Sequence, residues 1–145
     1  MKPFILSIPI IIGLLLVGVS LKAQSNLLLD DEGTIKTKLA ADSAIFKEDK
    51  YDNNGKRFAV FEFSLKNPYS TAYFFFDTNE KCDEIYYLYN DEKPLGNLVM
   101  AYNAIFSKIP NAFGWISTKE RVVIQVIRQN DIPGFILSFQ KITQQ

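Results

Sequence analysis

The sequence contains no histidine, and that absence narrows the chemistry open to the protein. Histidine is the commonest general base near neutral pH and a frequent zinc ligand, so both kinds of site lose their usual residue. Serine and cysteine nucleophiles that rely on a histidine partner are excluded for the same reason. The seven glycines stand singly, without the spacing of a phosphate-binding loop. We therefore expect no cofactor, no metal and no enzymatic activity.

A basic cluster is also missing. Lysine and arginine number 16, aspartate and glutamate number 16, and the basic residues form only short pairs such as Lys56-Arg57. Nucleic acids and anionic membrane surfaces both require a concentrated basic footprint. Neither is expected as a partner.

Cysteine occurs once, at Cys82, so an intramolecular disulfide is excluded and stability must come from the core. Three interpretations of Cys82 remain open. It is a half-buried residue where a strand begins, one side of an intermolecular disulfide, or a reactive thiol. Lys81 favours the thiolate, whereas Glu80, Asp83 and Glu84 oppose it.

Carboxylates are the remaining candidates for chemistry. Asp77, Asn79 and Asp83 have part of the spacing of a calcium loop, but Lys81 stands at a ligand position and Cys82 replaces the turn glycine. Calcium is therefore not expected. A small carboxylate-based hydrolase stays open as an alternative, although a domain of about 120 residues leaves little room for a sugar cleft.

The N-terminus carries the only long apolar run. Lys2 precedes an uncharged stretch over 3–21, and Ala23 is a suitable residue before a cleavage site. This order is typical of a secretory signal peptide over 1–23, which predicts a periplasmic or secreted protein without stable membrane insertion. An uncleaved N-terminal membrane anchor is the alternative, because the stretch is nearly long enough to span a bilayer.

The rest of the chain predicts a linker over 24–33 and one domain over 34–145. Ile35 and Leu39 indicate a short helix near 34–42. Apolar residues at steps of three and four indicate a long helix near 92–109, with Asp91 as its cap.

Strand patterns fill the remaining segments. Asn54-Gly55 predicts a hairpin turn, and Pro133-Gly134 suits a second turn near the C-terminus. Runs of strands without regular helical crossovers indicate an α+β fold. We expect an antiparallel sheet of about five or six strands with the long helix packed on one face.

Aromatic residues gather around the turn at 77–81. Alternation places Tyr73 and Phe75 on one face of the sheet and Phe74 and Phe76 on the other, and the next strand is apolar on both faces too. One helix covers only one face. The second face is covered by the N-terminal segment, closed by curvature, or left open to bind a partner. The candidate binding residues are Tyr73, Phe75, Tyr86, Tyr87, Tyr89 and, in a later loop, Trp115.

The stretch AYFFFDTNEKCDEIYYLY, over 72–89, resembles a hairpin of small bacterial envelope proteins. Such envelope proteins include domains similar to the β-lactamase-inhibitor-protein fold and to outer-membrane assembly lipoproteins. The resemblance implies short helices on an antiparallel sheet and a protein-binding role. The chain lacks the lipid-bearing cysteine of the lipoproteins, and no functional residue is transferred from them.

These observations lead to one main hypothesis and two alternatives. The main hypothesis is a non-catalytic exported module that binds an envelope protein. The first alternative is a carrier of an apolar ligand, such as a lipid or fatty acid, in a helix-covered sheet. The second alternative is the carboxylate-based hydrolase.

Overall fold

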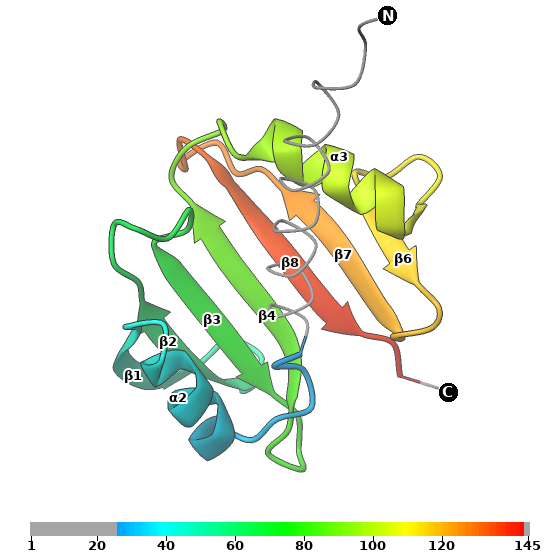
Figure 1. The fold of residues 1–145 in the computed structure, drawn as a ribbon. Helices are drawn as coiled ribbons and strands as arrows, with labels where there is room; N and C mark the ends of the chain where they lie inside the picture. The colour runs from blue at the N-terminus through cyan, green and yellow to red at the C-terminus, as the bar shows by residue number, and fades with distance from the viewer. Residues whose placement is uncertain (1–25, 144–145) are drawn as a thin grey trace, which may run out of the picture.

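Eight strands form one antiparallel sheet in the computed structural model, which describes residues 26–143 (Figure 1). The order across the sheet is β1-β2-β3-β4-β8-β7-β6-β5, so two four-stranded meanders meet where β4 pairs with β8. The strands are β1 (Ile45–Tyr51), β2 (Arg57–Glu62), β3 (Thr71–Phe76), β4 (Cys82–Tyr89), β5 (Ser107–Lys108), β6 (Gly114–Ser117), β7 (Val122–Ile127) and β8 (Phe135–Lys141).

The predicted α+β class stands, but the predicted sheet of five or six strands under one long helix is wrong. The sheet has eight strands, and the described residues contain two helices, α2 (Glu32–Ala40) and α3 (Leu95–Ile105). The helix expected over 92–109 with Asp91 as its cap instead begins at Leu95 and has no side-chain cap. It ends at Ile105, because Phe106 turns to an extended backbone and the next two residues pair with β6. Strands of two and four residues are too short to reveal an alternating pattern.

Helix α2 begins two residues before the predicted start. Asp31 caps the helix, because its side chain accepts a hydrogen bond from the backbone N–H of Thr34 at 2.8 Å. Within the helix, Ile35 and Leu39 are buried. The same spacing that predicted the helix therefore marks the side that packs on the sheet.

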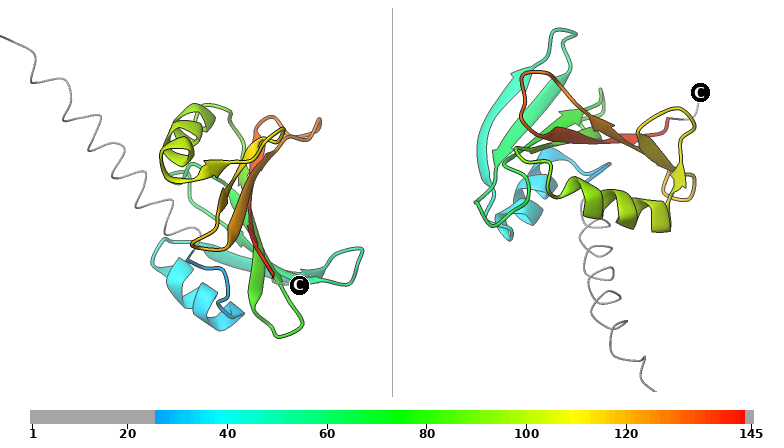
Figure 2. Two further views of the ribbon diagram at one scale, coloured as in Figure 1. Left: turned by 90° about the vertical axis from the view of Figure 1, so that its right-hand side faces the viewer. Right: turned by 90° about the horizontal axis from the view of Figure 1, so that it is seen from above.

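Both helices lie on the same face of the sheet (Figures 1 and 2). Helix α2 lies near β1–β3, and α3 lies over the other meander. Aromatic rings fill the layer beneath α3, where the ring of Tyr102 lies 5.0 Å from Trp115 and 6.4 Å from Phe139, centroid to centroid. This helix-covered face holds the main core.

The segment before α2 packs on the domain through two leucines. Leu27 and Leu28 are buried. The N–H of Leu29 donates to the Cys82 carbonyl at 2.6 Å, and the N–H of Cys82 donates to the Asp30 carbonyl at 2.8 Å. These residues of the expected linker thus help to cover the helix-covered face. The predicted signal peptide lies outside the described residues.

The junction between β4 and β8 requires a glycine beside it. The rings of Tyr89 and Phe135 stack with centroids 4.5 Å apart and planes 9° from parallel. A Cβ atom on Gly134 would lie 1.9 Å from the Tyr89 carbonyl oxygen. Backbone must therefore shift before any larger residue fits at position 134.

Arg57 joins three elements on the helix-covered side. Its guanidinium contacts the carboxylates of Glu32 in α2, Asp49 in β1 and Glu80 in the β3–β4 turn, and it lies 4.4 Å from the ring centroid of Phe76. Desolvation acts to raise the pKa of Glu32, but hydrogen bonds from Lys36 and Arg57 lower it overall. The ionised form of Glu32 is therefore favoured by folding.

We predict that Gly134→Ala lowers the free energy of unfolding by about 2 kcal/mol or more, because the added methyl group meets backbone atoms. Urea denaturation measures the change. The matched control is Gly96→Ala in α3, where a Cβ meets nothing within 4 Å. That control is expected to gain up to about 1 kcal/mol from helix propensity. Equal stability of the two variants would contradict the steric explanation.

We predict that Arg57→Gln costs about 1–2 kcal/mol near neutral pH, since charged hydrogen bonds are lost at a partly buried site. Because the pKa of Glu32 is depressed, this stabilisation exists above the usual carboxyl pKa of 4.5 and disappears as the pH falls below it. Unfolding curves of both proteins across the acid range test this. Lys47→Gln, which breaks an exposed pair with Glu62, is the control and should cost less than about 0.5 kcal/mol. A difference between wild type and Arg57→Gln that stays constant with pH would refute the role of Glu32.

Candidate functional site

The face of the sheet opposite the helices is uncovered within the described part of the chain (Figure 2). Cross-strand pairing sets its side chains in rows, with Phe58 opposite Phe75, Val60 opposite Tyr73, and Leu88 opposite Ile136. Most of these side chains are only half-buried, whereas their neighbours along each strand are fully buried. We call this surface the open face, and it comprises Phe58, Val60, Tyr73, Phe75, Tyr86, Leu88 and Ile136.

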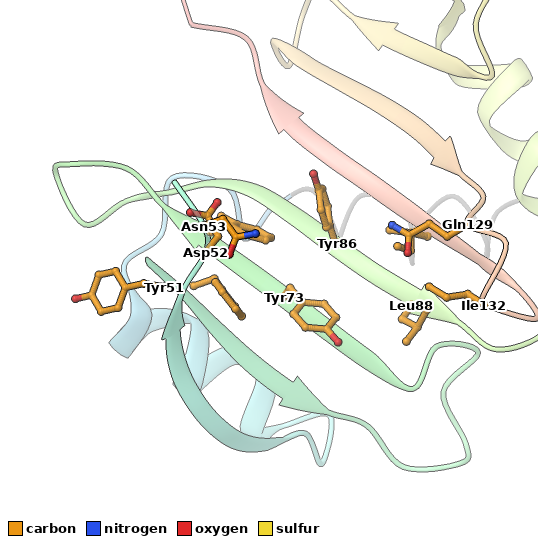
Figure 3. Close-up of a pocket in the computed structure, with 11 residues that line it drawn as sticks. Tyr51, Asp52, Asn53, Tyr73, Tyr86, Leu88, Gln129 and Ile132 are labelled. Carbon is orange, nitrogen blue, oxygen red and sulfur yellow. The ribbon is translucent and has the colours of Figure 1, made fainter. Parts of the chain in front are cut away.

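The open face is hollowed between two connections that rise above it. The hollow has a volume of about 500 Å³, within the range of known ligand sites. Figure 3 shows Asp52 and Asn53 of the β1–β2 turn at one end, and Gln129 with Ile132 of the β7–β8 connection at the other. We call this hollow the groove.

Aromatic rings form the centre of the groove. The ring centroid of Phe58 lies 6.1 Å from Tyr73 and 5.2 Å from Phe75, and Phe75 lies 5.1 Å from Tyr86. Their planes are inclined at 35° to 59°, and all four rings line the hollow. The rings stand on paired strands, so their positions are set by the sheet.

The lining of the groove has one charged side chain, Asp52. Its Oδ1 accepts hydrogen bonds from the backbone N–H groups of Asn54 and Lys56, each at 2.8 Å, which fixes the carboxylate in the turn. Neither lysine nor arginine lines the groove. The charge in the lining is therefore negative.

A second charged group lies beside the groove, where Lys56 pairs with Asp83 at 2.7 Å and with Glu84 at 3.5 Å. Desolvation acts to lower the pKa of Lys56, but the two carboxylates raise it overall. The hydroxyl of Tyr86 donates to Glu84 at 2.8 Å. Burial, together with this carboxylate, raises the pKa of Tyr86 to about 12, so the phenol is neutral at physiological pH.

The structure divides the predicted binding residues into two groups. Tyr73, Phe75 and Tyr86 lie half-buried on the open face. Tyr87 and Tyr89 point to the other face and are buried in the core. Trp115 is also buried, and its indole N–H donates to Asn103 of α3 at 2.8 Å.

Sequence reasoning did not single out several residues of the groove. Strand alternation could have identified Leu88, which lies two positions from Tyr86, and Phe58 lies directly opposite Phe75 in the paired strand. Asp52, Gln129 and Ile132 gave no such signal. They reach the groove from connections far apart in sequence, and only the tertiary structure brings them together.

Cys82 is fully buried at the start of β4. Its Sγ lies 3.5 Å from the Glu84 carbonyl oxygen, as a donor would. Burial raises the pKa of the thiol well above its usual value, so the reactive thiolate is disfavoured. The position favours a core role over a disulfide with another molecule.

Within residues 26–143, acidic and cysteine side chains form no cluster suited to a metal ion. Asp77 Oδ1 instead accepts hydrogen bonds from the backbone N–H groups of Asn79 and Lys81, at 2.8 and 3.0 Å. It holds the β3–β4 turn as Asp52 holds the β1–β2 turn. Neither helix in this part of the chain has the length and apolar character needed to cross a bilayer.

We predict that iodoacetamide modifies native Cys82 very slowly at mildly alkaline pH, since the thiol is buried and its pKa is raised. Mass spectrometry after timed labelling measures the rate. The same reaction in denaturant, where the thiol is exposed, is the control and should go to completion. Rapid native labelling, or a dimer that dissociates only with reductant, would contradict burial of this residue.

Comparisons with protein-family models, curated proteins and solved structures found no significant match to this chain. The resemblance of residues 72–89 to envelope proteins therefore stays a prediction, and the geometry of the groove is the basis for a functional proposal.

Proposed function

We propose that this protein is a non-catalytic binding module whose open face holds a protein partner. One observation carries the proposal: a row of half-exposed aromatic and aliphatic side chains on the sheet face opposite both helices. Large contiguous apolar patches on soluble domains mark interaction sites, and tyrosine and phenylalanine are enriched where proteins meet. The phenol of Tyr73 suits such a surface, because its ring makes contact while its hydroxyl stays hydrated.

Rigidity of the open face supports the proposal. Tyr73 and Tyr86 face each other across paired strands, and the ring contacts of Phe75 fix its neighbours. A partner that binds such a surface loses little free energy in ordering these side chains. We expect the surface to bind without rearrangement of the sheet.

The place of action that we propose is the bacterial envelope or the exterior of the cell. This part of the proposal depends on the signal-peptide pattern of residues 1–23, and its alternative is an N-terminal anchor in the same compartment.

Core packing favours a protein partner over a lipid held between helix and sheet. The ring of Tyr87 lies 5.8 Å from that of Phe139, and Tyr102 packs on Phe139 from α3. Rings at these distances fill the layer in which a helix-covered carrier would place its ligand. The groove lies on the other side of the sheet and is open to solvent.

The carboxylates give little support to a hydrolase. Asp77 and Asp91 accept backbone hydrogen bonds in turns, and Asp83 and Glu84 pair with Lys56. Each has a structural partner, and the groove contains a single carboxylate, that of Asp52. A two-carboxylate mechanism needs a second one facing it across the substrate.

We predict that a photo-crosslinking amino acid placed at Tyr73 or at Tyr86 captures one protein of defined mass in cells of the source organism. The reason is that both positions lie on the open face. Gel shifts and mass spectrometry of the adducts provide the measurement. The matched control is Met100 on α3, which is 62% exposed and lies on the helix-covered side. Adducts that are absent from the open face, or identical at all three positions, would rule out binding through this surface.

A further inference from the structure

The groove has a one-sided electrostatic character. Its lining contains a carboxylate, several aromatic rings, amides and aliphatic groups, and no cationic side chain. The face of an aromatic ring carries negative potential, so rings and the carboxylate of Asp52 act in the same direction. Such a site attracts a cation and repels an anion.

The chain already pairs cations with rings elsewhere in the fold. Lys36 Nζ lies 3.7 Å from the ring centroid of Phe46, and the Arg57 guanidinium lies 4.4 Å from that of Phe76. Both contacts fall within the distance at which cation–π attraction is significant. In the groove, by contrast, the rings of Phe58, Tyr73 and Tyr86 have no such partner among the described residues.

The lysines near the groove form ion pairs with carboxylates outside its lining. Lys56 does not line the groove; it pairs with Asp83 and Glu84, and its Nζ lies over the ring of Phe75, 5.7 Å from the centroid, so this one ring of the groove already has a cation. Lys50 pairs with Glu48 at 2.7 Å. The Oδ1 atom of Asp52 accepts hydrogen bonds from two backbone N–H groups, and within residues 26–143 this carboxylate forms no ion pair with a lysine or arginine. The negative potential of the groove is thus left for a cation from another molecule.

We propose that the protein partner inserts a lysine or arginine side chain into the groove. This inference rests on the proposed function and specifies the chemistry of the partner. The aliphatic stem of the side chain packs on Leu88 and Tyr73, and its charged end meets the ring faces and the carboxylate of Asp52. The amides of Asn53 and Gln129, at opposite ends of the groove, are placed to bind the backbone of the same segment.

The size of the groove agrees with a short basic segment. A hollow of about 500 Å³ is larger than one lysine side chain needs, so residues on either side of the cation are accommodated too. A bound hydrocarbon would leave the Asp52 carboxylate next to an apolar group, and a bound anion would be repelled by it. The lining therefore selects a cationic segment over both.

The test uses capped pentapeptides with a central lysine, arginine or norleucine between glycines, titrated into the 15N-labelled full-length chain. Norleucine has the apolar stem of lysine without its charge. We expect the lysine and arginine peptides to shift the amide signals of the open face, with weaker binding at high salt. We expect the norleucine peptide to bind at least severalfold more weakly.

Variants of the protein separate the contributions of charge and of ring faces to peptide binding from that of general apolar contact. Asp52→Asn keeps an oxygen that accepts the turn hydrogen bonds but removes the charge, and we expect it to weaken lysine-peptide binding roughly two- to fivefold. Its matched control is Asp77→Asn, since Asp77 holds a turn in the same way and lies outside the groove. Tyr73→Leu should weaken binding roughly two- to fivefold because the ring face is lost, while Tyr73→Phe should preserve it.

The outcomes distinguish this inference from the proposed function. If the norleucine peptide binds as tightly as the lysine peptide, or if Asp52→Asn has no more effect than Asp77→Asn, the cation inference is wrong. If no cationic peptide binds at millimolar concentration, it is also wrong. In each of these cases, a specific crosslink from Tyr73 would still support a protein partner on the open face, held there by apolar contact.

Discussion

The pairing of β4 with β8 is the interaction on which the rest of the structure depends. All other strand pairs join neighbours in the sequence, whereas this one joins residues about fifty positions apart, from Glu84 with Gln140 to Tyr89 with Phe135. Closing so long a loop costs conformational entropy, which the stacked rings and the ladder of hydrogen bonds must offset. Gly134 permits the approach, because a side chain there would meet the Tyr89 carbonyl. Without this pairing, the two meanders would have no common sheet.

One face of the sheet is covered by helices and the other is exposed because of the way the chain connects the strands. Helix α2 precedes the first meander, and α3 connects the two meanders. Both helices lie on the same side of the sheet (Figure 2), and Leu27 and Leu28 are buried in the core on that side. Adjacent residues of a strand point to opposite faces, so Tyr87 lies in the core while Tyr86 lies on the open face. The apolar residues of one face thus form the core, and those of the other face form the open surface that we propose as a binding site.

The groove combines contributions that no single element supplies. Strands β2, β3 and β4 provide rings, the β1–β2 turn provides Asp52, and the β7–β8 connection provides Gln129. Since β8 lies next to β4, the β7–β8 connection rises beside the aromatic strands. The proposed preference for a cationic partner depends on this arrangement, because Asp52 alone is only a turn residue, as Asp77 is in the β3–β4 hairpin.

The sequence by itself determined the local features of this protein. Asn54-Gly55 and Pro133-Gly134 marked real hairpin connections, Ile35 and Leu39 marked the buried side of α2, and alternation separated Tyr73 from Phe74. Turn chemistry and side-chain periodicity depend on neighbouring residues, so they can be read from the chain. The end of α3 at Ile105 and the two short strands β5 and β6 were missed, since pairing with β6 outweighed a helical pattern that continued to Ile109. Only the tertiary structure decided which aromatic face is covered, that Trp115 and Cys82 are buried, and that Asp52 and Gln129 share a groove. Those outcomes depend on contacts between distant segments, whose free energy is not expressed in any local pattern.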